Sequence, residues 1–278
     1  MGHLLDFPSE LLAQILALLP VRTLLNFSET SRYARSLANG NLSTISLDIH
    51  PIRPRNLGKS PEKENCVRIP EVHTYDYQTI TYFHDALVRN ILLRHAEMLQ
   101  VLDLSIWTFT IPIAMEISRL LALQKLSIRI EDDAYARAVP RAFLPLERLE
   151  QDEAWDLLGQ TAEWRDRLRV LKIENADLTM PHLVELLEQN HSCRELSLSG
   201  CRFIGEELWN FLGYAWIGGD FLQRLHVADC GGCLNERVLK TIVSLSGLQV
   251  CPNLHVEPTL FESLTYWKST STSTDVVE

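Results

Sequence analysis

The 278-residue chain has no long apolar run and no surplus of basic residues. It contains no stretch of about 18 uncharged apolar residues, so we expect no membrane span. Asp6, Pro8 and Glu10 interrupt the apolar N-terminus and no basic segment precedes them, which predicts that a secretory signal peptide is absent. Basic residues number 26 against 36 acidic ones, giving a formal net charge of −10. This balance argues against nucleic acid or an anionic membrane as the partner, because both need a basic face.

Motifs for catalysis and metal binding are also scarce. The sequence has no H-E-x-x-H, G-x-S-x-G or Walker A pattern. Its six cysteines are mostly far apart, and no export signal is expected, which favours reduced thiols in the cytoplasm and/or the nucleus. Cys230 and Cys233 have the C-x-x-C spacing of a metal knuckle or a redox pair, but no second ligand pair is near. We therefore expect no catalytic residue, no cofactor and no metal site.

The first forty residues hold the densest apolar pattern. Pro8 stands where proline is tolerated, in the first turn of a helix, with Asp6 or Ser9 available as the cap. The apolar side chains that follow exceed the single stripe that a surface helix needs; they are Leu11, Leu12, Ile15, Leu16, Leu18 and Leu19. Pro20 ends this helix because it cannot continue the hydrogen-bond ladder. Either the rest of the chain or a partner must cover the excess apolar surface.

Residues 5–39 resemble an F-box. The family pattern is Leu-Pro-x-Glu-Leu-Leu, apolar residues at helical spacing, a break, a second Leu-rich helix and a closing Ser-Arg-aromatic. Here Phe7 replaces the usual Leu, and Tyr33 replaces the commoner Trp. The resemblance implies a three-helix domain over residues 1–40 that binds the Skp-family adaptor of a cullin ubiquitin ligase. We expect the adaptor contacts to come from Phe7, Pro8, Leu11, Leu12, Ile15, Leu16, Leu19 and Leu24. The alternative is an ordinary N-terminal core helix.

A short phrase, Leu-x-x-Leu-x-Leu with conservative replacements, recurs through the rest of the chain. It begins at Leu99, Leu123, Leu168, Cys193, Leu222 and Cys251, with spacings of 24, 45, 25, 29 and 29 residues. The gap of 45 is close to two periods, and Leu146-Glu-Arg-Leu149 inside it is predicted to be a degenerate copy. Residues 42–47 predict a further strand directly after the first domain. The alternative is a coincidental periodicity of leucine.

Helical spacing of apolar residues between the phrases predicts amphipathic helices over 114–121, 180–187, 206–212 and 234–243. Strand and helix in alternation, with this period, resemble the leucine-rich-repeat family. The resemblance implies an α/β solenoid with a curved parallel sheet and about seven or eight units. Cys201 and Cys230, each after a strand, are similar to the cysteine-containing subclass found behind F-boxes, and Asn175 is assigned to the equivalent place.

Composition sets the remaining boundaries. Residues 51–79 are rich in proline and charge, which predicts a loop insertion in a solenoid that spans 41–267. Residues 80–98 predict a helix, whose apolar face comprises Ile80, Phe83, Leu87, Ile91 and Leu92. The low-complexity tail, 268–278, is predicted to be disordered.

Together the two resemblances imply a non-catalytic, substrate-recognition subunit of an SCF-type ubiquitin ligase. Its partners would be the Skp-family adaptor, a cullin held through that adaptor, and an unidentified target protein. A non-degradative adaptor-bound scaffold and a plain repeat interaction module are the alternatives. Because strand side chains alternate, residues between the phrase leucines are expected to point out from the concave sheet towards the target. The candidates are Lys172, Glu174, Glu195, Ser197, Arg224, His226 and His255; their mixed charge favours a polar protein segment over nucleic acid or lipid.

Overall fold

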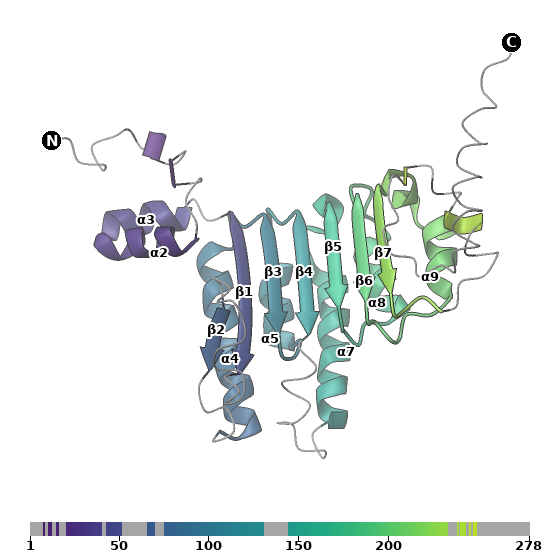
Figure 1. Ribbon diagram of the computed structural model, residues 1–278, viewed down its shortest axis with the longest axis horizontal. Helices are drawn as coiled ribbons and strands as arrows, with labels where there is room; N and C mark the ends of the chain where they lie inside the picture. The colour runs from purple at the N-terminus through teal and green to yellow at the C-terminus, as the bar shows by residue number, and fades with distance from the viewer. Residues whose placement is uncertain are drawn as a thin grey trace, which may run out of the picture.

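The computed structural model describes residues 8, 11–12, 15–16, 21–40, 43–51, 66–69, 75–130, 144–232, 238, 240–242, 245 and 247–248. The architecture is α/β, with an open parallel sheet and helices packed along one of its faces (Figure 1). Helices α2 (Val21–Thr30) and α3 (Arg32–Gly40) lie beyond the β1 edge of this sheet (Figure 1). Among the described elements, no helix covers the opposite face of the sheet (Figure 1).

The sheet has seven strands in the order β2-β1-β3-β4-β5-β6-β7, and every neighbouring pair is parallel. From β1 onward, with β2 set aside at the edge, the spatial order follows the chain order. Each strand and helix therefore stacks beside the unit before it. The strands are β1 (Thr44–Pro51), β2 (Cys66–Ile69), β3 (Val101–Ile106), β4 (Lys125–Ile130), β5 (Val170–Glu174), β6 (Glu195–Ser199) and β7 (Arg224–Ala228).

The helices follow ordinary start signals. Asp76 caps the long α4, because its carboxylate accepts the Thr79 N–H at 2.7 Å. Pro112 and Pro181 stand in the first turns of two later helices, where a missing N–H is tolerated. The described helices after α3 are α4 (Tyr77–His95), α5 (Ile111–Ser118), α7 (Leu144–Thr161), α8 (Met180–Leu187) and α9 (Glu207–Asn210), with short turns η4 (Arg165–Arg167), η5 (Phe211–Ala215) and η6 (Ile217–Phe221). Within the described ranges, no helix has the length and apolar content needed to cross a bilayer.

The repeated phrase sets the register of the sheet. Its second apolar position forms one buried row across six strands, namely Ile45, Leu102, Leu126, Leu171, Leu196 and Leu225. Its third position forms a second buried row, namely Leu47, Leu104, Ile128, Ile173, Leu198 and Val227. Because strand side chains alternate, both rows face the helices and the residues between them face the helix-free side. The strands predicted at the phrases that begin at Leu99, Leu123, Leu168, Cys193 and Leu222 are confirmed, as is the further strand predicted over residues 42–47.

Backbone hydrogen bonds repeat at the start of the strands. The Ser43 carbonyl accepts two N–H groups of the next unit, from Gln100 at 2.8 Å and Val101 at 3.0 Å. The carbonyls of Gln100, Gln124, Arg169 and Arg194 each accept two N–H groups in the same way. Five successive junctions therefore have one geometry, although the chain between the strands differs in length.

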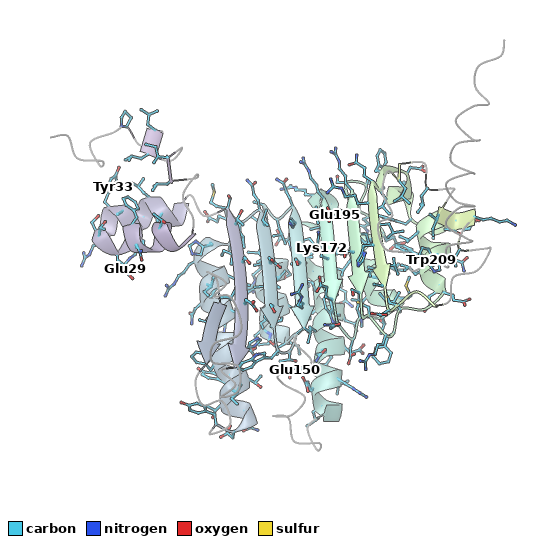
Figure 2. The ribbon with its side chains drawn as sticks, viewed as in Figure 1. Glu29, Tyr33, Glu150, Lys172, Glu195 and Trp209 are labelled. Carbon is cyan, nitrogen blue, oxygen red and sulfur yellow. The ribbon has the colours of Figure 1, made fainter. Side chains whose placement is uncertain are left out.

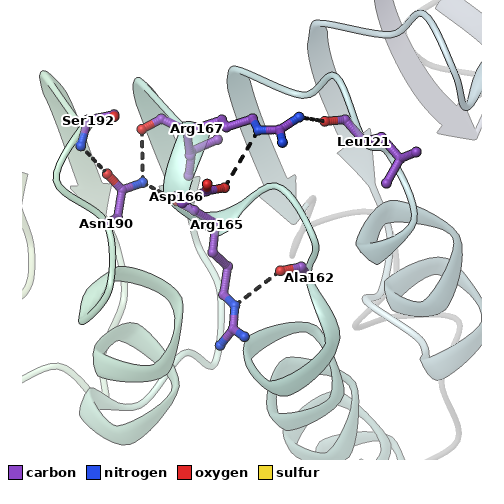
Figure 3. Close-up of polar contacts among 8 residues, drawn as sticks. Leu121, Ala162, Arg165, Asp166, Arg167, Asn190 and Ser192 are labelled. Atoms are coloured by element: carbon purple, nitrogen blue, oxygen red, sulfur yellow. Dashed lines mark hydrogen bonds and ion pairs between the residues drawn. The ribbon is translucent and has the colours of Figure 1, made fainter.

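Asn190 fixes the entry into β5 and β6 (Figure 3). It is fully buried, and its Nδ2 donates to the carbonyls of Arg165 and Leu168. Its Oδ1 accepts the N–H groups of Ser192 at 2.7 Å and Cys193 at 2.8 Å. One side chain therefore satisfies four backbone groups at the turn where two neighbouring units meet.

A residue in the left-handed region ends each of β5, β6 and β7, at Asn175 (φ 56°), Gly200 (φ 66°) and Asp229 (φ 54°). The residues that follow are Ala176, Cys201 and Cys230. Register makes these three positions equivalent, so the assignment of Asn175 to the cysteine place was wrong by one residue. Gly200 is required for space as well as φ, because a Cβ there would lie 2.3 Å from Asn175 Oδ1.

The cysteines at this turn bond back to the preceding unit. Cys201 Sγ lies 3.7 Å from the Ile173 carbonyl, and Cys230 Sγ lies 3.6 Å from the Leu198 carbonyl. Cys201 is fully buried, as expected, and Cys230 is partly buried. The thiols thus serve as small side chains that also donate to a backbone oxygen.

The degenerate repeat predicted at Leu146-Glu-Arg-Leu149 is wrong. Those residues lie in α7, and both leucines are exposed. Strand β4 pairs directly with β5, so the described part of the 45-residue interval contributes a helix and no strand. A leucine spacing of three fits a helix as well as the start of the repeat phrase, and helix length decided between them.

The prediction of a simple loop over residues 51–79 is also wrong in part. It contains β2, which pairs with Asp48–Pro51, and the start of α4. The predicted apolar face of α4 is wrong at Phe83, which is exposed. The fully or nearly buried positions of this helix are spaced four residues apart. They are Ile80, His84, Val88 and Leu92.

Of the remaining predicted elements, some are confirmed and others lie outside the described residues. The helix over 180–187 is confirmed as α8, and the one over 206–212 is found as α9 continuing into the η5 turn. The phrase at Cys251, most of the helix over 234–243, and the tail 268–278 lie outside the described residues.

Replacing Asn190 with Ala should destabilise the protein by about 3 kcal/mol, because buried backbone groups lose their partners. Urea unfolding followed by circular dichroism measures the change. Asp166→Ala is the control, since that side chain lies on the surface nearby (Figure 3) and its loss should change stability little. Equal unfolding midpoints for the Asn190 variant and the native protein would contradict this account of the turn.

The buried thiols should resist alkylation. Burial raises the pKa of both Cys193 and Cys201 to about 12, so almost no thiolate exists at pH 8. Treatment with iodoacetamide, followed by peptide mass spectrometry, should leave both cysteines unmodified in the native protein and modify them fully in urea. Rapid native modification of Cys201 would show that the turn is open in solution.

Candidate functional site

The N-terminal apolar residues divide into two sets. The N–H groups of Leu11 and Leu12 both lie 3.1 Å from the Pro8 carbonyl, as expected for a helix that begins at the proline. Leu12 and Leu16 are fully buried within the chain, whereas Leu11 is 46% exposed and Ile15 is 38% exposed. The exposed pair is therefore available to a partner, and the buried pair stabilises the domain.

The buried set connects this first segment to the next helices. Leu16 packs with Ala38, Phe27 and Leu37, which come from α2 and α3. Ser31 starts α3 by accepting the Ala34 N–H on its Oγ at 3.0 Å. The chain thus buries one side of the apolar segment itself.

Two further points concern the adaptor candidates. Tyr33, which stands where the F-box pattern commonly has Trp, is 49% exposed on α3 (Figure 2). Phe7, Leu19 and the side chain of Leu24 lie outside the described residues. The adaptor contacts predicted for all eight residues stay predictions, and the burial of Leu12 and Leu16 within the chain makes these two the poorest candidates.

A second candidate surface is the helix-free face of the sheet. Lys172 and Glu195 lie on it, on the neighbouring strands β5 and β6 (Figure 2). Their ammonium and carboxylate groups form an ion pair, and Arg224 Nη1 on β7 lies 3.4 Å from the second oxygen of Glu195. Partial burial acts to raise the pKa of Glu195, but the two cations outweigh it and hold that pKa below its ordinary value.

The remaining candidates continue this surface. Arg129 Nε on β4 lies 2.5 Å from Glu174 Oε2 on β5. Register aligns Lys172 with Ser197, and Ser197 with His226, in one row across three strands. Ser197 is buried between these longer neighbours, and His226 is half-buried. His255 lies outside the described residues.

Cross-strand ion pairs therefore give this face its chemistry. Positive and negative groups alternate from β4 to β7, and each candidate cation has a carboxylate on an adjacent strand. Such a surface offers paired charges and hydroxyl groups to a protein segment. It does not present the uniform positive field that nucleic acid requires.

Glu147 is a titratable group that the sequence did not single out. It is buried on α7, where Gln151 Nε2 lies 3.4 Å from its Oε1. Loss of solvent raises the pKa of Glu147 to about 7, although hydrogen bonds from Thr108 and Gln151 act in the opposite direction. The repeat predicted at this place concealed it, because a helix was needed to bring Glu147 to the end of β3.

Comparison with known proteins gives one clear match. The F-box domain model matches residues 4–45, which run from the first apolar segment through α2 and α3 to the start of β1. No curated protein matches the chain. The match agrees with the N-terminal motif and with the exposed apolar side chains at Leu11 and Ile15. Residues 4–45 are therefore an F-box domain, which supports an F-box protein that binds a Skp-family adaptor.

Proposed function

We propose that the chain is a substrate-recognition subunit of an SCF-type cullin ubiquitin ligase in the cytoplasm and/or nucleus. The observation that carries the proposal is the F-box at residues 4–45, which suggests a substrate-receptor role through Skp binding. The cullin would then be held through the adaptor, and the rest of the chain would hold a target protein.

Exposed apolar residues support the adaptor interface. Leu11 and Ile15 lie four residues apart, so they project from one side of a helix. Leu12 and Leu16 occupy the other side and pack inside the F-box. A large apolar side chain buried on binding contributes roughly 1.5–3 kcal/mol, so two of them account for a substantial part of an interface.

We infer that the region after the F-box is a leucine-rich-repeat solenoid of the cysteine-containing subclass. Three features support this: phrase spacings of 24 to 29 residues apart from the 45-residue interval before β5, one register across the aligned strands, and thiols at equivalent positions after β6 and β7. Repeat stacking leaves the sheet free on one side, and solenoids use such faces to bind partners.

The target would bind this helix-free face between β4 and β7. Lys172, Glu195 and Arg224 lie there in a paired cluster, and a polar segment of the target can exchange hydrogen bonds with it. The ligase reaction needs no catalytic side chain from this chain. Its contribution is to raise the local concentration of the target near the ubiquitin carrier.

The adaptor interface is tested by replacing Leu11 and Ile15 together with Asp. Two carboxylates in an apolar interface should abolish co-purification of the adaptor, because burying them unpaired is costly. Leu12 is unsuitable for this test, since Asp at a fully buried position would also unfold the F-box.

Leu146→Asp is the matched control, because Leu146 is an exposed helical leucine outside the F-box. It should retain the adaptor at the native level. If the Leu11/Ile15 variant also retains it, the adaptor interface is assigned to the wrong residues. Accumulation of captured target proteins in cells that lack the gene distinguishes a ligase from a non-degradative scaffold.

The target surface is tested by charge reversal at Lys172 and Arg224. Replacing both with Glu places two carboxylates beside that of Glu195, which should reduce target capture at least about tenfold. Affinity purification with quantitative mass spectrometry measures target and adaptor in one experiment. Arg148→Glu, on the exposed helical side, is the control, and adaptor levels should be equal in all samples. Unchanged target capture by the double variant would place the target site elsewhere.

A further inference from the structure

Three side chains of metal-ligating type meet where α7 packs on α8. Asp152 and Asp156 lie one turn apart on α7, and His182 lies in the first turn of α8. His182 Nε2 lies 3.1 Å from Asp156 Oδ1 and 3.4 Å from Asp152 Oδ1. The three ligand atoms are all within 4.8 Å of one another.

These separations match the size of a zinc coordination shell. Ligand atoms at roughly 2.0–2.2 Å from a tetrahedral zinc ion stand about 3.4 Å from each other. Both nitrogen–oxygen distances are close to this value, so small rotations of the aspartates would place all three atoms around one ion. The aspartates are 55% and 50% exposed, which leaves a fourth position open to water.

The imidazole of His182 is already oriented for this role. The residue is 3% exposed, and its Nδ1 lies 2.9 Å from Thr179 Oγ1. In the structure, Nδ1 also accepts the backbone N–H of Thr179, at 3.2 Å. When Nε2 binds a metal, the ring proton moves to Nδ1, which then donates to Thr179 Oγ1 in place of accepting that N–H. Histidine ligands are commonly held by such a hydrogen bond from the second ring nitrogen.

The charge at this contact favours a bound cation. Within the described ranges, the ion pairs of Asp152 and Asp156 are with His182 alone, and neither carboxylate has a Lys or Arg partner.

The same helix contact holds a third carboxylate. Glu185 Oε2, on α8, is buried and has no hydrogen-bond partner among the described residues. It faces α7 at Gly159, where a Cβ would lie 2.7 Å from it. Arg165 approaches this point, but its printed hydrogen bonds go to backbone carbonyls of Gly159 and Glu185. The contact between α7 and α8 therefore carries a further carboxylate, three residues after His182 on the same helix.

We propose that Asp152, Asp156 and His182 bind one zinc ion that joins α7 to α8. Imidazole and carboxylate ligands suit this metal. The site lies on the helical side of the sheet, so it is independent of the adaptor and target surfaces. This proposal departs from our expectation of no metal site. That expectation rested on the Cys230/Cys233 pair, and the distance of 26 residues between Asp156 and His182 gave no motif in the sequence.

The test is a zinc titration of the full-length protein after treatment with EDTA. Isothermal calorimetry should give one zinc per chain, and zinc should raise the midpoint of thermal unfolding. Asp152→Asn with Asp156→Asn keeps the side-chain size but removes both anionic ligands. Zinc should then bind at least about tenfold more weakly and no longer raise the midpoint.

Two control variants separate this site from other sources of zinc binding. Glu153→Gln removes a neighbouring exposed charge on α7, and Cys230→Ser with Cys233→Ser removes the cysteine pair. Both should bind zinc like the native protein. The proposal fails if the native protein binds no zinc, if the Asp152/Asp156 variant binds it equally well, or if either control variant loses it.

Discussion

The buried rows of leucine and isoleucine that cross the sheet hold the rest of the structure in place. Leu102, Leu126 and Leu171 lie in register on consecutive strands, and each is fully buried beneath the helices. A shift of one residue in any strand would move such a side chain to solvent, at roughly 1.5–3 kcal/mol for each one exposed. The carbonyl of Gln124, which accepts two N–H groups of the next unit, fixes the same register through the backbone. The positions of the surface charges and of the turns therefore follow from these rows.

The same alternation separates two chemistries within each strand. On β5, Leu171 and Ile173 enter the core, while Lys172 between them reaches the helix-free face. The charges of that face are ordered by the core, because the register that aligns Leu171 with Leu196 also brings Lys172 to Glu195. Adaptor binding needs none of this order, since the F-box packs its own Leu16 around α2 and α3. The F-box and the helix-free face of the sheet therefore depend on different parts of the core.

The sequence predicted most where a side-chain pattern alone determines the structure. The phrase at Leu102 and the F-box motif around Leu12 each combine several apolar positions at fixed spacing, and both were located correctly. Prediction failed where two structures share a local pattern. Leu146 and Leu149 fit a repeat or a helix, and the repeat is excluded because both lie in α7 and β4 pairs directly with β5.

The sites were less predictable than the fold. The candidates on the sheet face followed from alternation, but their pairing around Glu195 depends on register between strands. The division of the F-box leucines into buried Leu12 and exposed Leu11 depends on how its helices pack. Asp156 and His182 come together only because α7 and α8 are neighbours on the sheet. Contacts between distant segments therefore account for what the sequence did not reveal.

Strand β2 lies at the edge of the sheet, outside the order in which the other strands follow the chain, and there it shortens the unpaired edge of β1. It pairs with Asp48–Pro51, the second half of β1, at the margin of the sheet nearest the F-box (Figure 1). A bare eight-residue margin of parallel strand would offer its backbone groups to another copy of the chain. With β2 in place, the part of that margin left without a paired strand among the described elements is Thr44–Leu47. Four unpaired residues are a short template for strand addition, which disfavours edge-to-edge pairing between copies at the end of the sheet next to the F-box.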